Sequence, residues 1–232
     1  MRNDCCTFLT LPTYQRCWFN NPEPLPMKKT AGVQKRALNA LQLILDGELE
    51  DAFLHIATAI DSTSKRRFPS LKSQRERYVK YLQEHQHDLL LIATHGRLYL
   101  ENTRFVNPVS KEALTIAEAV YLVRNSSVHD PQELEEVVSF TRTGQYGFDK
   151  QGRYVINTSF LTALVLIVLT DPSNQLYLDL TGLGSIKHGE VEINLSTLKG
   201  GRSALLRKYR KFVEERERIK NDLKAKSRTS NQ

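Results

Sequence analysis

TIAEAVYLVRNSSVHD, residues 115–130, is the stretch from which the fold can be worked out. Ile116, Val120 and Val123 recur at helical spacing, so the first half predicts a buried helix with one apolar stripe. Asp130–Pro131 predicts the end of that helix, because a proline disfavours helical conformation in the residue before it. The stretch therefore predicts a core helix with polar side chains in its last turns.

The polar end of this helix offers groups that can bind a phosphate and move a proton. Arg124, Asn125 and His129 supply a guanidinium, an amide and an imidazole. Asn125 and His129 are four residues apart and share a helix face with Tyr121. Arg124 and His129 are five residues apart, so they point about 140° away from each other. They meet only if the helix loosens after Ser126 or if a second copy of the chain supplies one of them.

Helical periodicity recurs along most of the chain, so a mainly α protein is expected. Ser110 is suited to cap the helix that contains residues 115–130, and Gly47 is suited to end the first helix. Residues 160–169 are apolar all round and predict a wholly buried helix, whereas residues 89–94 suit a helix or a strand. The further expected helices span residues 33–45, 48–65, 73–87 and 202–226, the last docked through Leu205, Leu206, Tyr209, Phe212 and Val213.

The second half of the chain also contains strand patterns. Residues 137–142 and 153–157 alternate around a turn at residues 149–152 and predict a β-hairpin, and residues 176–180 and 191–195 predict two further strands. Four parts are therefore expected: a poorly ordered N-terminal extension (1–30), a helical domain (31–172) with the hairpin at about 137–157, a small β element (173–200) and a basic C-terminal helix with its tail (201–232).

The positive charge of the chain is concentrated at one end. Lys and Arg total 33 against 26 acidic residues, a formal net charge of +7. Residues 202–232 hold 11 basic and 4 acidic side chains, and the other 201 residues hold 22 of each. The excess is therefore a property of the C-terminal helix, which suits an anionic partner.

Cysteine and histidine usage predicts neither disulfides nor a metal site. Three cysteines near the N-terminus are odd in number and lack CxxC spacing, which favours a reducing, cytoplasmic setting. His85 and His87 do not share a helix face, and with His95 they are interpreted as solvated side chains. Residues 1–26 lack the apolar core of a signal peptide, and the longest apolar run has ten residues, against about 17–25 for a spanning helix. A soluble protein is expected.

Asp61 and Lys65 lie four residues apart on one face of the second helix. This order of charges supports a helix by about 0.3 kcal/mol, so a surface ion pair is the simplest interpretation. Arg66 and Arg67 follow directly and complete a basic cluster at the end of the same helix.

These residues resemble the motifs of a known family. Residues 124–129, from Arg124 to His129, resemble the R-x(4–6)-H motif of the HEPN domain, including the polar residue after the arginine. Asp61-x3-Lys65 is similar to the family's acidic-x3-Lys element. The resemblance covers about residues 33–170, with the hairpin as an insertion. It implies a HEPN-like four-helix up-and-down bundle that dimerises and brings two Arg124–His129 pairs to one cleft.

The resemblance further implies a metal-independent endoribonuclease of the kind found in toxin–antitoxin and antiphage defence systems. His129 would take the proton from an RNA 2′-hydroxyl or protonate the leaving 5′-oxygen. Arg124 would stabilise charge on the phosphate, and Asn125 would orient the imidazole or bind a phosphate oxygen. The product would be a 2′,3′-cyclic phosphate, formed without metal or cofactor. The supporting residues would be Asp61, Lys65 and Tyr121.

RNA, a second copy of the chain and an antitoxin or other regulatory protein are the expected partners, and no membrane is expected. Two alternatives remain open: a non-catalytic module that binds nucleic acid or a protein, and a helical scaffold in which Arg124 pairs with an acidic residue such as Asp61 while His129 caps a helix end. The RNA-binding residues would be Arg66, Arg67, Arg207, Lys208, Arg210 and Lys211.

Overall fold

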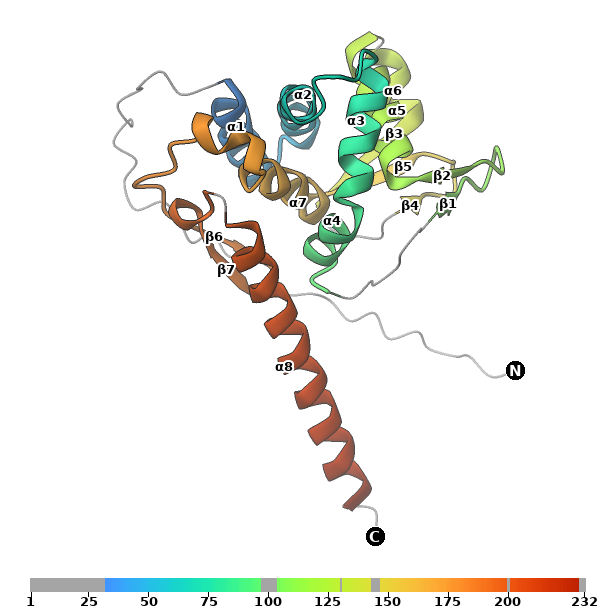
Figure 1. Cartoon of the computed structure of the whole chain (residues 1–232). Coiled ribbons are helices and arrows are strands. Elements are labelled where there is room, and N and C mark those ends of the chain that lie inside the picture. Colours follow the sequence, from blue (N-terminus) through green and yellow to red (C-terminus); the bar gives the residue numbers. More distant parts are fainter. Residues whose placement is uncertain (1–31, 97–103, 130, 143–146, 200, 230–232) are drawn as a thin grey trace, which may run out of the picture.

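The computed structural model describes residues 32–96, 104–129, 131–142, 147–199 and 201–229. The described chain is mainly helical with a few small sheets, which confirms the expected class (Figure 1). The predicted disorder of residues 1–30 lies outside the described residues. Among the described residues, no helix combines the length and the apolarity that crossing a bilayer requires.

The first two helices pack against each other and are joined by a tight turn at Gly47. Helix α1 (Gly32–Asp46) ends at Gly47, whose φ of 89° lies in the left-handed region that glycine adopts without strain. The Gly47 amide donates to the Leu43 carbonyl at 2.9 Å, as expected of a C-terminal cap. Helix α2 (Leu49–Arg67) then packs along α1 through Phe53, Ile56 and Ile60, which are wholly buried.

The helix predicted over residues 73–87 is divided in two. Helix α3 (Gln74–Glu84) is capped by Ser73, whose hydroxyl accepts from the Glu76 amide at 3.3 Å. Helix α4 (Gln86–Ala93) begins after His85, which has a φ of −107° and separates the two helices. The ambiguous apolar run at residues 89–94 is therefore helical up to Ala93.

Helix α5 (Ile116–His129) takes up residues 116–129 of the stretch quoted first and has Ile116, Val120 and Val123 in the core. The prediction that Ser110 caps this helix is wrong. Strands β1 (Arg104–Val106) and β2 (Ala113–Thr115) pair antiparallel before the helix. The Thr115 amide donates to Glu118 Oε2 at 2.8 Å, and Thr115 Oγ1 accepts from the Glu118 amide at 3.2 Å. This reciprocal pair is a capping box, and α6 (Pro131–Val137) follows α5.

Thr115→Ala is expected to lower the free energy of unfolding by about 1 kcal/mol, because an amide at the start of α5 loses its side-chain acceptor. Ser110→Ala is the matched control and should change it by less than about 0.5 kcal/mol. Urea unfolding followed by circular dichroism measures both. Equal losses in the two variants would contradict the assignment of the cap to Thr115.

The predicted hairpin has a different strand order. Strands β3 (Val138–Thr141), β4 (Gly147–Phe148) and β5 (Tyr154–Asn157) form one sheet in the order β3-β5-β4. Strand β3 runs parallel to β5, so the two predicted segments are neighbours but do not form a hairpin with each other. The antiparallel partner of β5 is the short β4.

Helix α7 (Thr158–Leu169) is the centre of the core, as its uninterrupted apolar sequence predicts. Every residue from Phe160 to Leu169 is buried, and the helix contacts α1, α2 and α4. Asn157, at the end of β5, caps it by accepting from the Phe160 amide at 2.9 Å.

The segment after α7 contains one of the two predicted strands. Residues 176–180 do not form a strand, because the 3-10 helix η1 (Pro172–Tyr177) takes up the first part of that segment. The predicted strand at residues 191–195 is present as β7 (Val191–Asn194), paired antiparallel with β6 (Ser185–His188). A second 3-10 helix, η2 (Leu195–Thr197), leads toward the last helix.

Helix α8 (Arg202–Thr229) has 28 residues and is therefore about 42 Å long. Leu205, Leu206 and Tyr209 are buried against α4 and β7, as the apolar stripe predicts. The remainder of the helix extends away from the body (Figure 1). The docked end of α8 therefore decides in which direction its charged surface points.

Candidate functional site

The residues singled out in the sequence meet where α2, α3 and α5 pack together. Arg124 Nη2 on α5 donates to Asp61 Oδ2 on α2 at 2.9 Å, and Gln74 Nε2 on α3 donates to the same oxygen at 2.9 Å. The Arg124 and Asp61 side chains are only 11% and 18% exposed. This contact is therefore a largely shielded ion pair that ties three helices together.

A buried tyrosine completes this cluster. Tyr78 on α3 is 0% exposed, and burial, reinforced by the charge of Asp61, raises the pKa of its hydroxyl. Among the described residues, neither this hydroxyl nor Asp61 Oδ1 has a hydrogen-bond partner. The Tyr121 ring meets the Tyr78 ring edge-on at 5.6 Å, and the Arg75 guanidinium lies 5.9 Å from the Tyr121 ring centre. Tyr78 therefore stays neutral beneath a surface of aromatic and cationic groups.

The side chains of Lys65 and Asn125, two other predicted members of this site, form no hydrogen bond or ion pair with the Asp61–Arg124 pair within the described ranges. Lys65 is exposed and forms no ion pair with Asp61, although both residues are described. Asn125 is exposed on α5. The side chain of His129 lies outside the described residues, so its predicted catalytic role is not tested. Since α5 remains helical through His129, the loosening after Ser126, which is one of the two ways in which Arg124 and His129 could meet, is absent.

Arg124 therefore has a structural partner. Its pairing with Asp61 is the contact expected for the scaffold alternative. A guanidinium that already neutralises a carboxylate contributes less net charge to a phosphate than a free one. The position of Arg124 in one copy of the chain thus favours helix packing over catalysis.

The basic cluster at the end of α2 is also used within the fold. Arg66 donates to Asn174 Oδ1 at 2.7 Å and lies 4.2 Å from the centre of the Tyr177 ring. Arg67 pairs with Glu84 at 2.9 Å and approaches Asp171 at 3.6 Å. Arg66 and Arg67, two of the six predicted RNA-binding residues, therefore make intramolecular contacts.

The predicted cations of α8 form no ion pair within the described part of the chain. Arg207, Lys208, Arg210 and Lys211 are exposed, and none pairs with a carboxylate in the described part of the chain. Lys208 donates only to the Glu192 main-chain carbonyl, at 3.2 Å. We call these four residues the α8 cationic face.

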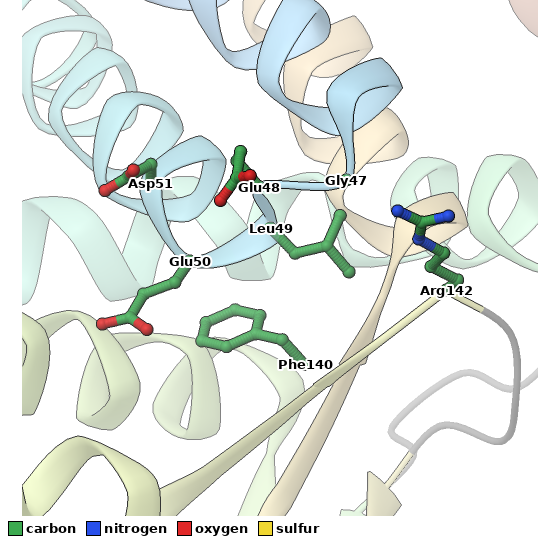
Figure 2. A pocket seen from close by; sticks show the side chains of 7 residues that line it. All are labelled: Gly47, Glu48, Leu49, Glu50, Asp51, Phe140 and Arg142. Atoms are coloured by element: carbon green, nitrogen blue, oxygen red, sulfur yellow. The ribbon is translucent and has the colours of Figure 1, made fainter.

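A separate open cavity of about 590 Å³ lies between the start of α2 and β3. Figure 2 shows its carboxylates toward one end and Arg142 beside Gly47 at the other. Acidic side chains in the first turn of α2 are favoured by the helix dipole, which accounts for their position. Throughout the described ranges, no group of three or more His, Cys, Asp or Glu residues could hold a metal ion. The cavity is lined by Gly47, Glu48, Leu49, Glu50, Asp51, Phe140 and Arg142.

One buried ionic cluster was not predicted. Asp171 is 0% exposed and lies near His85, Arg67 and Arg202. The interpretation of His85 as a solvated side chain is therefore wrong, since only 5% of the residue is exposed. No local pattern marks this cluster, because its members come from four distant segments.

The family model described as Rv1289 matches residues 32–220, which is most of the chain, and the chain therefore belongs to this family. No curated protein and no solved structure matches it significantly. The predicted membership of the HEPN family is wrong, because the matching family is a different one. The resemblance rested on two short motifs, and such motifs arise readily without common descent.

Proposed function

We propose that this member of the Rv1289 family binds RNA through the α8 cationic face. The observation that carries the proposal is the cluster of four exposed cations within five residues, with no acidic residue between positions 203 and 213. On a regular helix, Arg207, Lys208, Arg210 and Lys211 fall within an arc of about 160°. The arc faces away from the apolar stripe that docks α8, so body contacts leave it accessible.

The expected binding is electrostatic and limited in extent. Glu214, Glu215 and Glu217 follow the cationic face and confine it to little more than one turn. Neutralising four phosphates of a single strand gives a slope of about −3 in a plot of log affinity against log salt concentration. The proposal therefore implies moderate affinity with strong salt dependence and little sequence preference.

RNA cleavage by Arg124, Asn125 and His129 remains a prediction, as do a homodimer, a regulatory protein partner and a cytoplasmic setting. The Asp61–Arg124 ion pair gives cleavage no support. Incubating the full chain with RNA in EDTA, beside a His129→Ala variant, tests it. Metal-independent cleavage that the variant loses would restore a catalytic assignment.

Binding is tested with a fluorescently labelled single-stranded uridine oligonucleotide and polarisation measured between about 50 and 200 mM salt. Replacing all four residues of the α8 cationic face with glutamine should weaken binding by about tenfold or more and flatten the salt slope by about 3. Far-ultraviolet circular dichroism checks that the variant folds.

The matched control removes the same number of charges elsewhere. Lys35, Arg36, Lys72 and Lys150 are exposed on other parts of the body, and their replacement with glutamine should leave the salt slope nearly unchanged. Equal weakening by both variants would show a general charge effect and overturn the proposal. Tighter binding of duplex DNA than of RNA would replace RNA with DNA as the ligand.

A further inference from the structure

The buried cluster around Asp171 joins four segments of the chain at the base of α8. Asp171 follows Thr170, the C-cap of α7, and its Oδ1 accepts from the Ser173 amide at 2.8 Å and the Ser173 hydroxyl at 2.6 Å. Its Oδ2 lies 3.3 Å from His85 Nε2, 3.6 Å from Arg67 Nη1 and 3.8 Å from Arg202 Nη2. A wholly buried carboxylate is thus shared by the ends of α2, α3 and α7 and the start of α8.

Arg202 has an unusual position, because it is the first residue of α8. A cation there opposes the dipole of its own helix. Its guanidinium instead donates to the Ile167 carbonyl and to Thr170 Oγ1, the latter at 3.2 Å. Both acceptors lie at the C-terminal end of α7, where a cation is favoured. The guanidinium of Arg202 therefore interacts with the C-terminal end of α7, although its main chain is part of α8.

His85 links Arg202 to the carboxylate. Arg202 Nη1 lies 2.6 Å from His85 Nδ1 and 3.0 Å from Nε2, and a guanidinium can only donate. Because the Asp171 carboxylate can only accept, Nε2 keeps its proton for Asp171 and Nδ1 accepts from Arg202. His85 Nε2 then carries the proton and donates to Asp171. Burial lowers the pKa of His85, which keeps the ring in this neutral form. Although burial alone would raise it, hydrogen bonds from His85 and Ser173 and the charge of Arg202 lower the pKa of Asp171 to about 2.

We infer that Asp171, His85, Arg67 and Arg202 are positioning residues that fix the direction of α8 and thereby hold the α8 cationic face against bound RNA. This inference rests on the proposed function. The apolar stripe of Leu205, Leu206 and Tyr209 attracts α8 to the body, but hydrophobic contact is non-directional. The hydrogen bonds of Arg202 are directional and lie one and a half turns before Arg207. Loss of these bonds leaves the helix attached through its apolar stripe and the Tyr209–His188 contact, but its first turn is no longer fixed to α7, so its angle can change.

The direction of α8 is measured directly by double electron–electron resonance. Spin labels are placed at the exposed positions Glu217 on α8 and Lys35 on α1 through Glu217→Cys and Lys35→Cys. The full chain is used, with its native cysteines replaced by serine so that the labels are unique: Cys5, Cys6 and Cys17. Wild-type anchoring should give one narrow distance distribution.

Arg202→Lys retains the charge but loses the planar fork, and Arg202→Gln loses both. We expect the distance distribution to broaden about twofold in Arg202→Gln and to an intermediate degree in Arg202→Lys, while helical content is retained. RNA binding should weaken by about fivefold in Arg202→Gln, because a mobile helix must be ordered on binding. Asp171→Asn should resemble Arg202→Gln; if it does not fold, the two Arg202 variants still decide the matter.

Ile60→Val is the control for general destabilisation, since Ile60 is buried in α2 and is not one of the Asp171 cluster residues. It should lower thermal stability without broadening the distances. Unchanged distances in both Arg202 variants, or broadening with unchanged RNA affinity, would overturn the inference. Broadening in a protein whose parent binds no RNA would support the positioning of α8 and refute the proposed function instead.

Discussion

Asp61→Leu is expected to lower the free energy of unfolding by about 3 kcal/mol. The change leaves the Arg124 guanidinium, 11% exposed, with no carboxylate in a largely shielded contact between α2 and α5. Breaking a buried ion pair from one side typically costs about 3–5 kcal/mol, and the partial exposure of this pair places it at the lower end. Gln74 also loses its acceptor, but it is exposed and can turn to water.

Removing both charges should restore most of this loss. In the double variant Asp61→Leu with Arg124→Met, no unpaired charge remains, so the free energy of unfolding should return to within about 1 kcal/mol of wild type. Lys65→Ala serves as the control on the same helix and should be nearly neutral. Urea unfolding of wild type, the single variants Asp61→Leu and Arg124→Met, and the double variant measures the cycle. If the two single losses simply add in the double variant, the ion pair is not the source of the effect.

Acidification is expected to destabilise the protein through His188. This side chain is 3% exposed on β6; its Nδ1 lies 2.5 Å from the Tyr209 hydroxyl on α8, and its ring centre lies 4.4 Å from that of His95. Burial, and then the neighbouring His95, lower the pKa of His188 to about 3. Because the folded pKa lies below the unfolded value, the stability is complete above about pH 6.5 and is lost as the pH falls toward 3.

The size of this effect follows from the proton linkage. In the window from about pH 6.5 to pH 4.5, the folded protein excludes one proton that the unfolded chain binds, which costs about 1.4 kcal/mol per pH unit. Urea unfolding across this window should show the slope. His188→Asn keeps a polar group near Tyr209 but cannot titrate, so the difference between the two proteins isolates His188 from His85, whose pKa is also lowered.

His87→Gln is the control for this experiment, because the His87 side chain is 43% exposed. Its pH dependence should match that of wild type. A His188→Asn protein that loses stability as steeply as wild type over the same window would show that another group causes the acid sensitivity.

Helices α1, α2, α5, α7 and α8 could be predicted from local sequence because their apolar residues recur at helical spacing or without interruption. Helix α6 was not predicted, and the helix predicted over residues 73–87 is divided in two. Helix α7 is the clearest case, since residues 160–169 are apolar all round and prove to be the centre of the core. Strand partners were harder to predict. The alternating sequence predicts the strands β3 and β5. Their parallel pairing, however, depends on the intervening β4 and on contacts with α2 and α7. Alternation along a strand carries no information about the direction of its neighbour.

The candidate site shows the same division. Asp61 and Arg124 stand out in the sequence, and the ion pair between them is one of the alternatives that the sequence leaves open. The partners of His85 could not be read locally: Asp171 is 86 residues away and Arg202 is 117 residues away. Tertiary packing decides whether His85 is buried with these partners, and the sequence around a single histidine does not indicate it.

The late position of Arg202 in the chain bears on how the protein is made. Asp171 precedes Arg202 by 31 residues, so it leaves the ribosome first, by about 2–6 s at ordinary rates of synthesis. During that interval α7 can pack with α1, α2 and α4, while the carboxylate at its end lacks the last of its cations. Only the arrival of α8 completes the charge balance of the core. Nascent chains that have not reached residue 202 therefore carry an incompletely compensated buried charge, which a chaperone or protease could distinguish from the finished fold.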